Sequence, residues 1–268
     1  MKYIDFIKQL DHRPDHERLE IIIAWLQQHG IPFRRQDYRT GSNLVIDLGA
    51  WPRRTGISSH FDKIEESGGA NDNGSAIAVC LGIIERFMEK KDETMGLRIF
   101  FFDEEENGLR GSAAYTRQYG IADLTGLINM ELVGMGNKLA LWPVNQKDKG
   151  TLLQAVEQSA TRQHTQAIRF DKIITNTADH LSFRNAGLAD AFTITCISDD
   201  DIKAAHLYYK ALQQGADTMT LHGILHRAPV FAHYHQPSDT FEKLEERTLA
   251  MVAEVIWNAL PGHQHQLI

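Results

Sequence analysis

Residues 97–102, Leu-Arg-Ile-Phe-Phe-Phe, form an almost uninterrupted apolar run near the middle of the chain. Such a run is typical of a central strand whose two faces are both covered by other parts of the protein. It therefore predicts a sheet that lies buried between two layers of helices. The run ends at Asp103 and a triple glutamate, residues 104–106, so charged side chains are expected at the end of this strand.

The rest of the chain alternates strand patterns with helix patterns. Strands are predicted at 32–39, 43–48, 55–59, 127–130, near 167–174 and at 191–196; helices are predicted at 2–11, 16–29 (capped by Asp15), 75–89, from 108, at 149–162, after Asp179, twice within 199–227 and at 242–259. This alternation predicts an α/β three-layer sandwich, in which helices flank a mixed, mostly parallel central sheet. We expect a single domain over residues 1–268, because no internal repeat, low-complexity tract or linker interrupts the pattern.

Composition excludes several classes of protein. The chain carries 28 basic and 35 acidic residues, a formal net charge of -7, so we expect no basic face for a nucleic-acid partner. Cys80 and Cys196 lie in apolar runs and are predicted to be buried free thiols in a reducing compartment. The N-terminal residues lack the apolar core of a signal peptide, and no apolar run approaches the ~20 residues of a membrane span. We therefore expect a cytoplasmic protein without a membrane partner; the sequence does not indicate its oligomeric state.

Side chains that bind metals follow the ends of predicted strands. His60, the pair Glu105 and Glu106, and Glu131 each come directly after a strand pattern. In α/β sheets, ligands bind beyond the carboxyl ends of the strands. We therefore expect these side chains to meet in one site.

Two loop motifs add candidate ligands. In His60-Phe-Asp62, the histidine would bind metal through one ring nitrogen and donate its other ring N–H to the carboxylate of Asp62; the alternative is a loop histidine beside a solvated aspartate. The segment Gly69-Ala-Asn-Asp72-Asn-Gly-Ser75 has the composition of a turn that caps the following helix. Asp72 within it is equally a hard ligand that can bridge two cations.

The triple glutamate lies where charge is unexpected. A run of charges is usually a solvated face, but like charges at the mouth of a dry sheet are costly unless a positive charge lies beside them. Metal ions would supply that charge, and adjacent carboxylates allow one to bind metal while its neighbour handles protons. Histidines together with carboxylates suit a two-zinc hydrolytic site better than a structural zinc site, which would use cysteines. His222 and His226 lack the glutamate of a His-Glu-x-x-His zinc helix, and we expect them to be structural or on the surface.

Six motifs, taken in chain order, resemble those of the di-zinc exopeptidase family, which includes bacterial leucyl aminopeptidase and, more distantly, glutaminyl cyclase. They are His60-x-Asp62, Gly69-Ala-Asn-Asp72-Asn-Gly-Ser75, Phe102-Asp-Glu-Glu105-Glu106-x-Gly-Leu-x-Gly-Ser112, Asn129-x-Glu131-x-Val-Gly134, Ala178-Asp179-His180-x-x-Phe183 and His235-Gln-Pro-Ser-Asp239-Thr240. The resemblance spans residues 60–240, which is most of the chain. It implies the fold of the zinc exopeptidases and two zinc ions in one site.

The resemblance also implies a role for each metal ligand. Asp72 bridges the two ions. Glu106 and His235 complete the site of one ion, and His60 and Glu131 complete the site of the other. In this family the peptide bond after the bridging aspartate is often cis.

Catalytic roles follow from the same motif registers. Glu105 is implied to be the general base, and Asp62, beside His60, is the second residue predicted to be catalytic. Glu104 and His233 fall outside the registers and are not expected to take part.

The chain departs from the family at three places. The family usually has aspartate where this chain has Glu131, and Ala178 replaces a serine. Residues 199–232 match no part of the family. Because this segment directly precedes His235, we expect either a lid or specificity wall, or helical decoration alone.

The residues and the resemblance together predict an aminopeptidase, a metal-dependent hydrolase that removes the N-terminal amino acid from a peptide or aminoacyl-amide substrate. Zinc is the metal that the resemblance implies, although nitrogen and oxygen ligands also suit manganese or cobalt. Two alternatives stay open: a glutaminyl-peptide cyclase with a single zinc ion, and a catalytically inactive binding module on the same fold.

Overall fold

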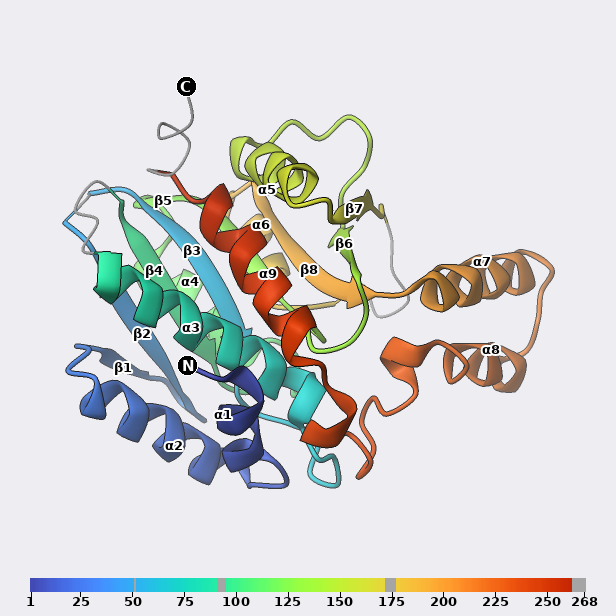
Figure 1. Cartoon of the computed structure of the whole chain (residues 1–268), viewed down its shortest axis with the longest axis horizontal. Coiled ribbons are helices and arrows are strands. Elements are labelled where there is room, and N and C mark those ends of the chain that lie inside the picture. The colour runs from blue at the N-terminus through green and yellow to red at the C-terminus, as the bar shows by residue number, and fades with distance from the viewer. Residues whose placement is uncertain (51, 91–94, 172–176, 262–268) are drawn as a thin grey trace.

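The computed structural model describes residues 1–50, 52–90, 95–171 and 177–261, and its centre is an eight-stranded sheet (Figure 1). The strands are β1 (Arg34–Asp37), β2 (Ser42–Leu48), β3 (Arg54–His60), β4 (Leu97–Phe102), β5 (Leu124–Met130), β6 (Lys138–Trp142), β7 (Gln166–Arg169) and β8 (Ala191–Ile197). They follow in the order β1-β2-β4-β3-β5-β8-β6-β7. β4, β3, β5 and β8 are parallel neighbours, whereas β2 and β6 flank this centre in the antiparallel direction. The sheet is therefore mixed with a parallel centre, as predicted.

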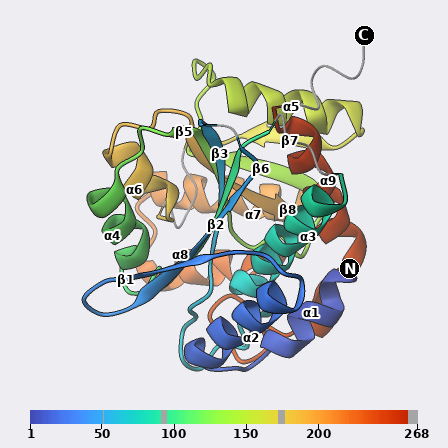
Figure 2. The ribbon, with the colours of Figure 1, turned by 90° about the vertical axis from the view of Figure 1, so that its left-hand side faces the viewer.

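Helices cover both faces of the sheet (Figure 2). One layer holds α1 (Tyr3–Leu10), α2 (Asp15–Gln28), α3 (Ser75–Lys90), α5 (Thr151–Arg162) and α9 (Glu246–Ala259), and the other holds α4 (Arg110–Tyr119) and α6 (His180–Asn185). Side chains of β4 alternate between the two layers, with Ile99 and Phe101 in the larger core and Phe100 and Phe102 in the smaller one. The apolar run at 97–102 is thus buried on both faces, which confirms its interpretation as a central strand.

Three details differ from the expectations or extend them. No strand was predicted at β6, which pairs with β8 and β7 and so depends on its neighbours in space. Asp15 does not cap α2, because Pro14 occupies the N-cap position and the Asp15 carboxylate accepts a hydrogen bond from the backbone N–H of Lys63. The strand predicted near 167–174 corresponds to β7, which ends earlier, at Arg169, and residues 172–174 lie outside the described residues.

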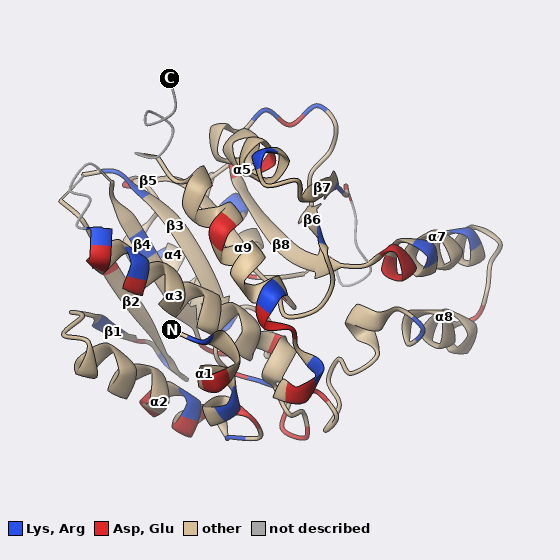
Figure 3. Ribbon diagram, viewed as in Figure 1, with Lys and Arg blue, Asp and Glu red and all other residues tan. Residues whose placement is uncertain are grey.

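The segment that matched no family motif forms a helical hairpin of α7 (Asp199–Gln213) and α8 (Thr218–Leu225), which extends away from the sheet beyond β8 (Figure 1). Within these two helices, only Asp201 and Ile224 are buried. Among the described residues, no helix has both the length and the apolar character of a membrane span. Acidic and basic residues lie close together on α2, α3 and α9, whereas on α7 the acidic residues gather in the first turn and basic residues follow (Figure 3). Cys80 and Cys196 are buried free thiols, as predicted.

Candidate metal centre

Three neighbouring strands bring candidate ligands to one edge of the sheet. His60 is the last residue of β3, Glu105 and Glu106 follow β4, and Glu131 directly follows β5. Because β3 pairs in parallel with both β4 and β5, the carboxyl ends of the three strands lie side by side. The expected convergence at this edge is therefore observed.

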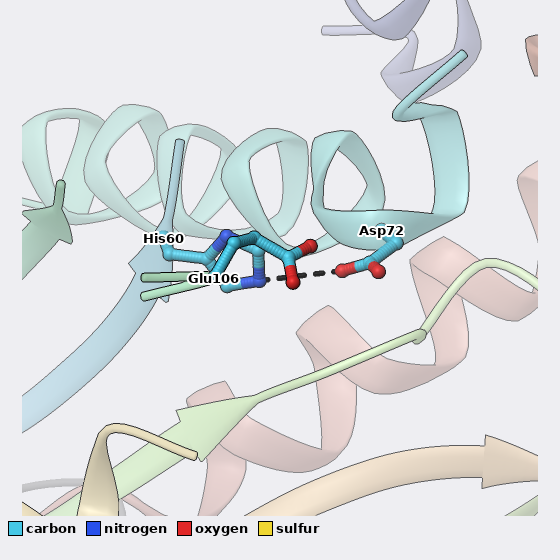
Figure 4. Close-up of side chains that lie close together, drawn as sticks. All are labelled: His60, Asp72 and Glu106. Atoms are coloured by element: carbon cyan, nitrogen blue, oxygen red, sulfur yellow. Dashed lines mark ion pairs between the residues drawn. The ribbon is translucent and has the colours of Figure 1, made fainter. Parts of the chain in front are cut away.

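Two loops supply the remaining candidates. Asp72 lies in the π-helical turn η1 (Ala70–Gly74), which leads into α3. His235 lies between the short 3-10 helices η2 (Pro229–Phe231) and η3 (Phe241–Lys243), after the α7–α8 hairpin. Figure 4 shows the side chains of His60 and Glu106 directed toward Asp72.

The carboxylate of Asp72 lies between two histidines. Its Oδ1 atom is 3.3 Å from Nε2 of His60, and its Oδ2 atom is 3.3 Å from Nε2 of His235. Each histidine also has a glutamate partner. Nε2 of His60 is 3.2 Å from Oε2 of Glu131, and Nε2 of His235 is 3.1 Å from Oε2 of Glu106. The candidate donor atoms thus form two groups that share Asp72, in the pairing that the resemblance implies.

These donor atoms fit a divalent metal ion. One ligand atom from each of His60, Asp72 and Glu106 lies within 4.8 Å of the others. Nε2 of His235 and Oε1 of Glu106 are buried and make no hydrogen bond with the described residues, although His235 is close to two carboxylates. Buried polar atoms ordinarily have a partner, and a cation among these atoms would be one. Nitrogen and oxygen donors without cysteine suit zinc, manganese or cobalt.

Asp62 links two parts of the site. Nδ1 of His60 lies 2.9 Å from the backbone carbonyl oxygen of Asp62 and 3.3 Å from its carboxylate, so the closer acceptor for the ring N–H is the carbonyl rather than the predicted carboxylate. The carboxylate of Asp62 instead accepts hydrogen bonds from the backbone N–H groups of Glu105 and Glu106, both at 3.1 Å. Asp62 therefore positions His60 and the glutamate pair together.

Two amides orient the unusual ligand Glu131. Nδ2 of Asn129 donates a hydrogen bond of 2.9 Å to Oε1, and Nδ2 of Asn73 donates one of 2.8 Å to Oε2. Asn129 is itself fixed, because its Oδ1 atom accepts a hydrogen bond of 2.7 Å from the hydroxyl of Ser58. The carboxylate thus reaches Nε2 of His60 from a backbone position where the family usually has the shorter aspartate.

Asp239 anchors the loop that carries Asp72. Its carboxylate accepts hydrogen bonds from the backbone N–H groups of Asn71, at 2.8 Å, and of Asp72, at 3.0 Å. The Asp72–Asn73 peptide bond is cis, in agreement with the resemblance. Because Asp239 follows His235 by four positions in the sequence, one short segment both supplies a candidate ligand and holds the loop of another, Asp72.

Burial and charge perturb the ionisable groups of the centre. Burial raises the pKa of Glu105 well above its ordinary value; His60 opposes this effect, and neighbouring carboxylates add to it. Burial likewise raises the pKa of Glu131. Burial favours the neutral ring of both histidines, but adjacent carboxylates outweigh it, so that the pKa of His60 lies well above its ordinary value and that of His235 is raised to about 9. A bound cation would add positive charge to this centre and would therefore favour the deprotonated form of these groups.

Other candidate side chains lie outside the centre. The carboxylate of Glu104 is hydrogen-bonded to Arg110 at 3.2 Å, and Nδ1 of His233 is 2.9 Å from a serine hydroxyl. His222 on α8 and His226, which caps the end of this helix, are exposed, with ring centroids 6.4 Å apart. None of these contacts involves the carboxylate of Asp72.

Apolar side chains wall the cavity in which the candidate ligands lie. Leu132, Trp142, Phe231 and Tyr234 line it together with His60, Asp72, Glu105, Glu106 and Glu131. None of these wall residues was singled out from the sequence, because no local pattern marks an apolar side chain as part of a cavity wall. The ring of His180 packs edge-on against Trp142, with centroids 5.3 Å apart, so one of the six motifs supports the wall rather than the ligands.

A second, apolar cavity lies beside the first, beneath α7. Phe170, Ile202, Ala205 and Tyr209 contribute to its lining, and Thr195 and Phe231 line both cavities. Its empty volume, including its open mouth, is about 530 Å³. The hairpin segment therefore contributes directly to the surroundings of the candidate ligands.

The fold and the site together define an α/β metallopeptidase domain. The chain belongs to peptidase family M28, whose sequence profile matches residues 43–260. This match confirms the resemblance to the zinc exopeptidases that was inferred from the six motifs.

Comparison with known proteins identifies a longer relative in sequence and two similar solved structures, a glutaminyl cyclase and an aminopeptidase. The chain is 27% identical over 172 residues to the vacuolar membrane protease of Schizosaccharomyces japonicus, which covers 57% of this chain and 20% of that protein. The chain thus spans only about a fifth of the length of this relative. Porphyromonas gingivalis glutaminyl cyclase has a similar structure, with a TM-score of 0.73, 19% identity and 96% coverage of both chains. BSAP, a zinc aminopeptidase from Bacillus subtilis, has a TM-score of 0.62 and 18% identity, with 82% of this chain and 49% of that chain covered.

Proposed function

We propose that this chain is a metal-dependent aminopeptidase, which hydrolyses the N-terminal peptide bond of peptides with two divalent ions, most simply zinc. The observation that carries the proposal is the position of Asp72. Each of its carboxylate oxygens lies 3.3 Å from a different histidine, and each histidine has its own glutamate partner. A single structural zinc ion would not need two such groups around one carboxylate.

Five side chains would hold the ions: Asp72 with His235 and Glu106 on one side, and Asp72 with His60 and Glu131 on the other. Two bound ions in such a site supply Lewis acidity, which lowers the pKa of the attacking water and polarises the scissile carbonyl. The chain itself holds the two glutamates in position, because the carboxylate of Asp62 accepts hydrogen bonds from the backbone N–H groups of Glu105 and Glu106.

Glu105 is the proposed general base. It lines the same cavity as His60 and Asp72, and its backbone is held by Asp62. Its raised pKa suits a group that takes a proton from water and returns it to the leaving amine. Glu106, its neighbour, faces His235 instead, so the two glutamates have separate tasks.

Residues 199–232 are proposed to form a specificity wall for the N-terminal side chain of the substrate. Phe231 lies in this segment and lines both the cavity of the ligands and the apolar cavity beneath α7. An apolar or aromatic N-terminal residue would bury its side chain against this wall, which favours its binding. Helical decoration alone would leave no reason for Phe231 and Tyr209 to face a cavity beside the ligands.

Glutaminyl cyclisation is the second candidate, because the cyclase from Porphyromonas gingivalis matches this chain over 96% of both chains. A peptide that begins with glutamine separates the two activities. Hydrolysis adds the mass of one water to the products, whereas cyclisation removes the mass of one ammonia. The complete second ligand group of His60 and Glu131 favours hydrolysis.

The decisive experiment combines metal analysis with a panel of aminoacyl anilides and short peptides. The zinc-loaded chain should release N-terminal amino acids, lose this activity on chelation and regain it when zinc is restored. A chain that binds zinc yet releases no amino acid from any substrate would contradict the proposal and favour the cyclase or an inactive binding module.

A further inference from the structure

Arg18 is a fully buried cation beneath the candidate metal centre. Its side chain projects from α2 and is 0% exposed. Nε donates a hydrogen bond of 2.7 Å to the carbonyl oxygen of Phe61, and Nη1 donates hydrogen bonds of 3.0 Å to the carbonyl of Gly69 and of 3.4 Å to that of Leu10. Nη2 is buried and makes no hydrogen bond with the described residues. A buried charge is costly unless its surroundings compensate it, so its position requires an explanation.

The two shorter hydrogen bonds bind the two ends of the single loop that connects β3 to η1. Phe61 directly follows His60, and Gly69 lies three positions before Asp72. One planar guanidinium group therefore holds the end of β3 at His60 close to the turn that carries Asp72. Nε2 of His60 and Oδ1 of Asp72 lie 3.3 Å apart. By joining the backbone beside each residue, the guanidinium sets the distance between these two candidate ligands.

The backbone conformation at Gly69 leaves room for the guanidinium group of Arg18. Its φ angle is +74°, in the left-handed region, and a Cβ atom there would lie 2.6 Å from Nη1 of Arg18. Glycine tolerates this conformation without strain, and its missing side chain leaves the room that Arg18 occupies. The first residue of the motif Gly69-Ala-Asn-Asp72 thus leaves the space that the guanidinium of Arg18 occupies.

Carboxylates of the centre surround this charge at longer range. Burial lowers the pKa of Arg18, while Asp15, Asp72, Asp62 and Asp239 oppose that effect. Three of these four, Asp62, Asp72 and Asp239, are the residues that orient or form the candidate metal centre. Asp15 and three carboxylates of the site therefore offset part of the cost of burying this charge, without a direct ion pair among the described residues.

We propose that Arg18 is a positioning residue, which holds the end of β3 at His60 against the turn that carries Asp72 and thereby sets the metal affinity of the centre. This inference rests on the proposed metal-dependent function. Arginine suits the task because its rigid fork presents several N–H groups at once, whereas the single ammonium of lysine cannot reproduce that geometry. The group of His60, Asp72 and Glu131 should depend on Arg18 most, because His235 and Glu106 come from segments that Arg18 does not contact through its hydrogen bonds.

The test is a zinc titration of the metal-free full-length chain against a fluorescent chelator, with Arg18→Met, Arg18→Lys and the control Leu26→Ala. Leu26 is buried on the same helix, two turns farther along, so its truncation destabilises the fold without touching the loops. Arg18→Met should weaken zinc binding by about tenfold or more, as loss of a group that orients metal ligands commonly does, and Arg18→Lys should fall between it and the wild type. Leu26→Ala should lower the Tm but bind zinc as the wild type does.

Each outcome decides the role of Arg18. Wild-type zinc affinity in a folded Arg18→Met variant, or an equal loss in Leu26→Ala, would overturn the positioning role. If Arg18→Met does not fold, Arg18→Lys decides: wild-type affinity there would also overturn it, and weakened binding supports it. A wild-type chain that binds no zinc would instead contradict the proposed function, and this inference with it.

Discussion

Oδ1 of Asp72 lies 3.3 Å from Nε2 of His60, while the other oxygen of the same carboxylate faces a second histidine at the same distance. Asp72 is therefore the one candidate ligand that belongs to both groups of donor atoms. Its loop is held from two sides, because Asp239 binds its backbone N–H and Arg18 binds the carbonyl of Gly69. The consequences of this shared carboxylate are measurable.

Asp72→Ala should abolish the binding of both ions, whereas His235→Ala should remove only one. The reason is that Asp72 contributes an oxygen to each group and His235 contributes a nitrogen to one. Metal analysis after gel filtration measures the stoichiometry. His233→Ala is the matched control, since this nearby histidine bonds a serine hydroxyl and should leave the metal content unchanged. Two ions per chain in Asp72→Ala would contradict the bridging role.

Glu105→Gln should lower kcat by about 10²–10⁴-fold, the usual contribution of a general base, with wild-type metal content. The amide has nearly the shape of the carboxylate but cannot accept the proton of the attacking water. Glu104→Gln serves as the control, because Glu104 is hydrogen-bonded to Arg110 instead. Hydrolysis at the wild-type rate in Glu105→Gln would rule out this residue as the base.

Glu131→Asp should weaken zinc binding about 10–100-fold, even though aspartate is the usual residue of the family. The carboxylate of Glu131 is held at its present reach by the amides of Asn73 and Asn129. Shortening the side chain by one methylene withdraws it from both amides and from His60. Zinc titration with Glu104→Asp as the control measures the effect, and tighter binding by Glu131→Asp would be the opposite of this expectation.

Zinc binding should release protons and strengthen as the pH rises toward about 9. In the metal-free fold the pKa of His235 is raised to about 9, against ~6.5 in an unfolded chain. The histidinium therefore stabilises the metal-free fold fully below pH ~6.5, and this contribution is lost as the pH rises through about 9. Zinc binds the neutral ring, so it must displace the proton.

Proton release on zinc addition at pH 7, followed with an indicator dye in weak buffer, measures this linkage. His235→Ala should release fewer protons than the wild type, and His233→Ala should release as many as the wild type. A zinc affinity that does not change between pH 7 and pH 9 would show that His235 carries no such proton.

Ala205→Trp should lower kcat/KM for peptides with large apolar N-terminal residues about 10-fold relative to peptides that begin with alanine. Ala205 lines the cavity beneath α7, and an indole there fills the space proposed for the substrate side chain. Gln213→Trp, at the exposed end of α7, is the control for the added bulk. If Ala205→Trp lowered kcat/KM equally for all substrates, residues 199–232 would not select the N-terminal side chain of the substrate.

Much of the architecture was predictable because it depends on patterns within short stretches of chain. The apolar run at 97–102 indicated a strand covered on both faces, and Ile99 and Phe100 do point into different cores. The position of β6 was not predictable in this way, since a five-residue strand is defined by the partners on its two sides.

The chemical nature of the candidate centre came from the sequence, through the residue types at the strand ends and the order of the six motifs. Only the tertiary structure decided which atoms meet. The N–H of Asp72 and the carboxylate of Asp239 are 167 positions apart, and no local pattern records such a contact. Arg18 illustrates the same limit: in the sequence it is an ordinary helix residue, and its role depends on two carbonyl groups that folding brings beneath the centre. Periodicity and residue type act along the chain, whereas metal-binding geometry arises when distant loops pack against one another.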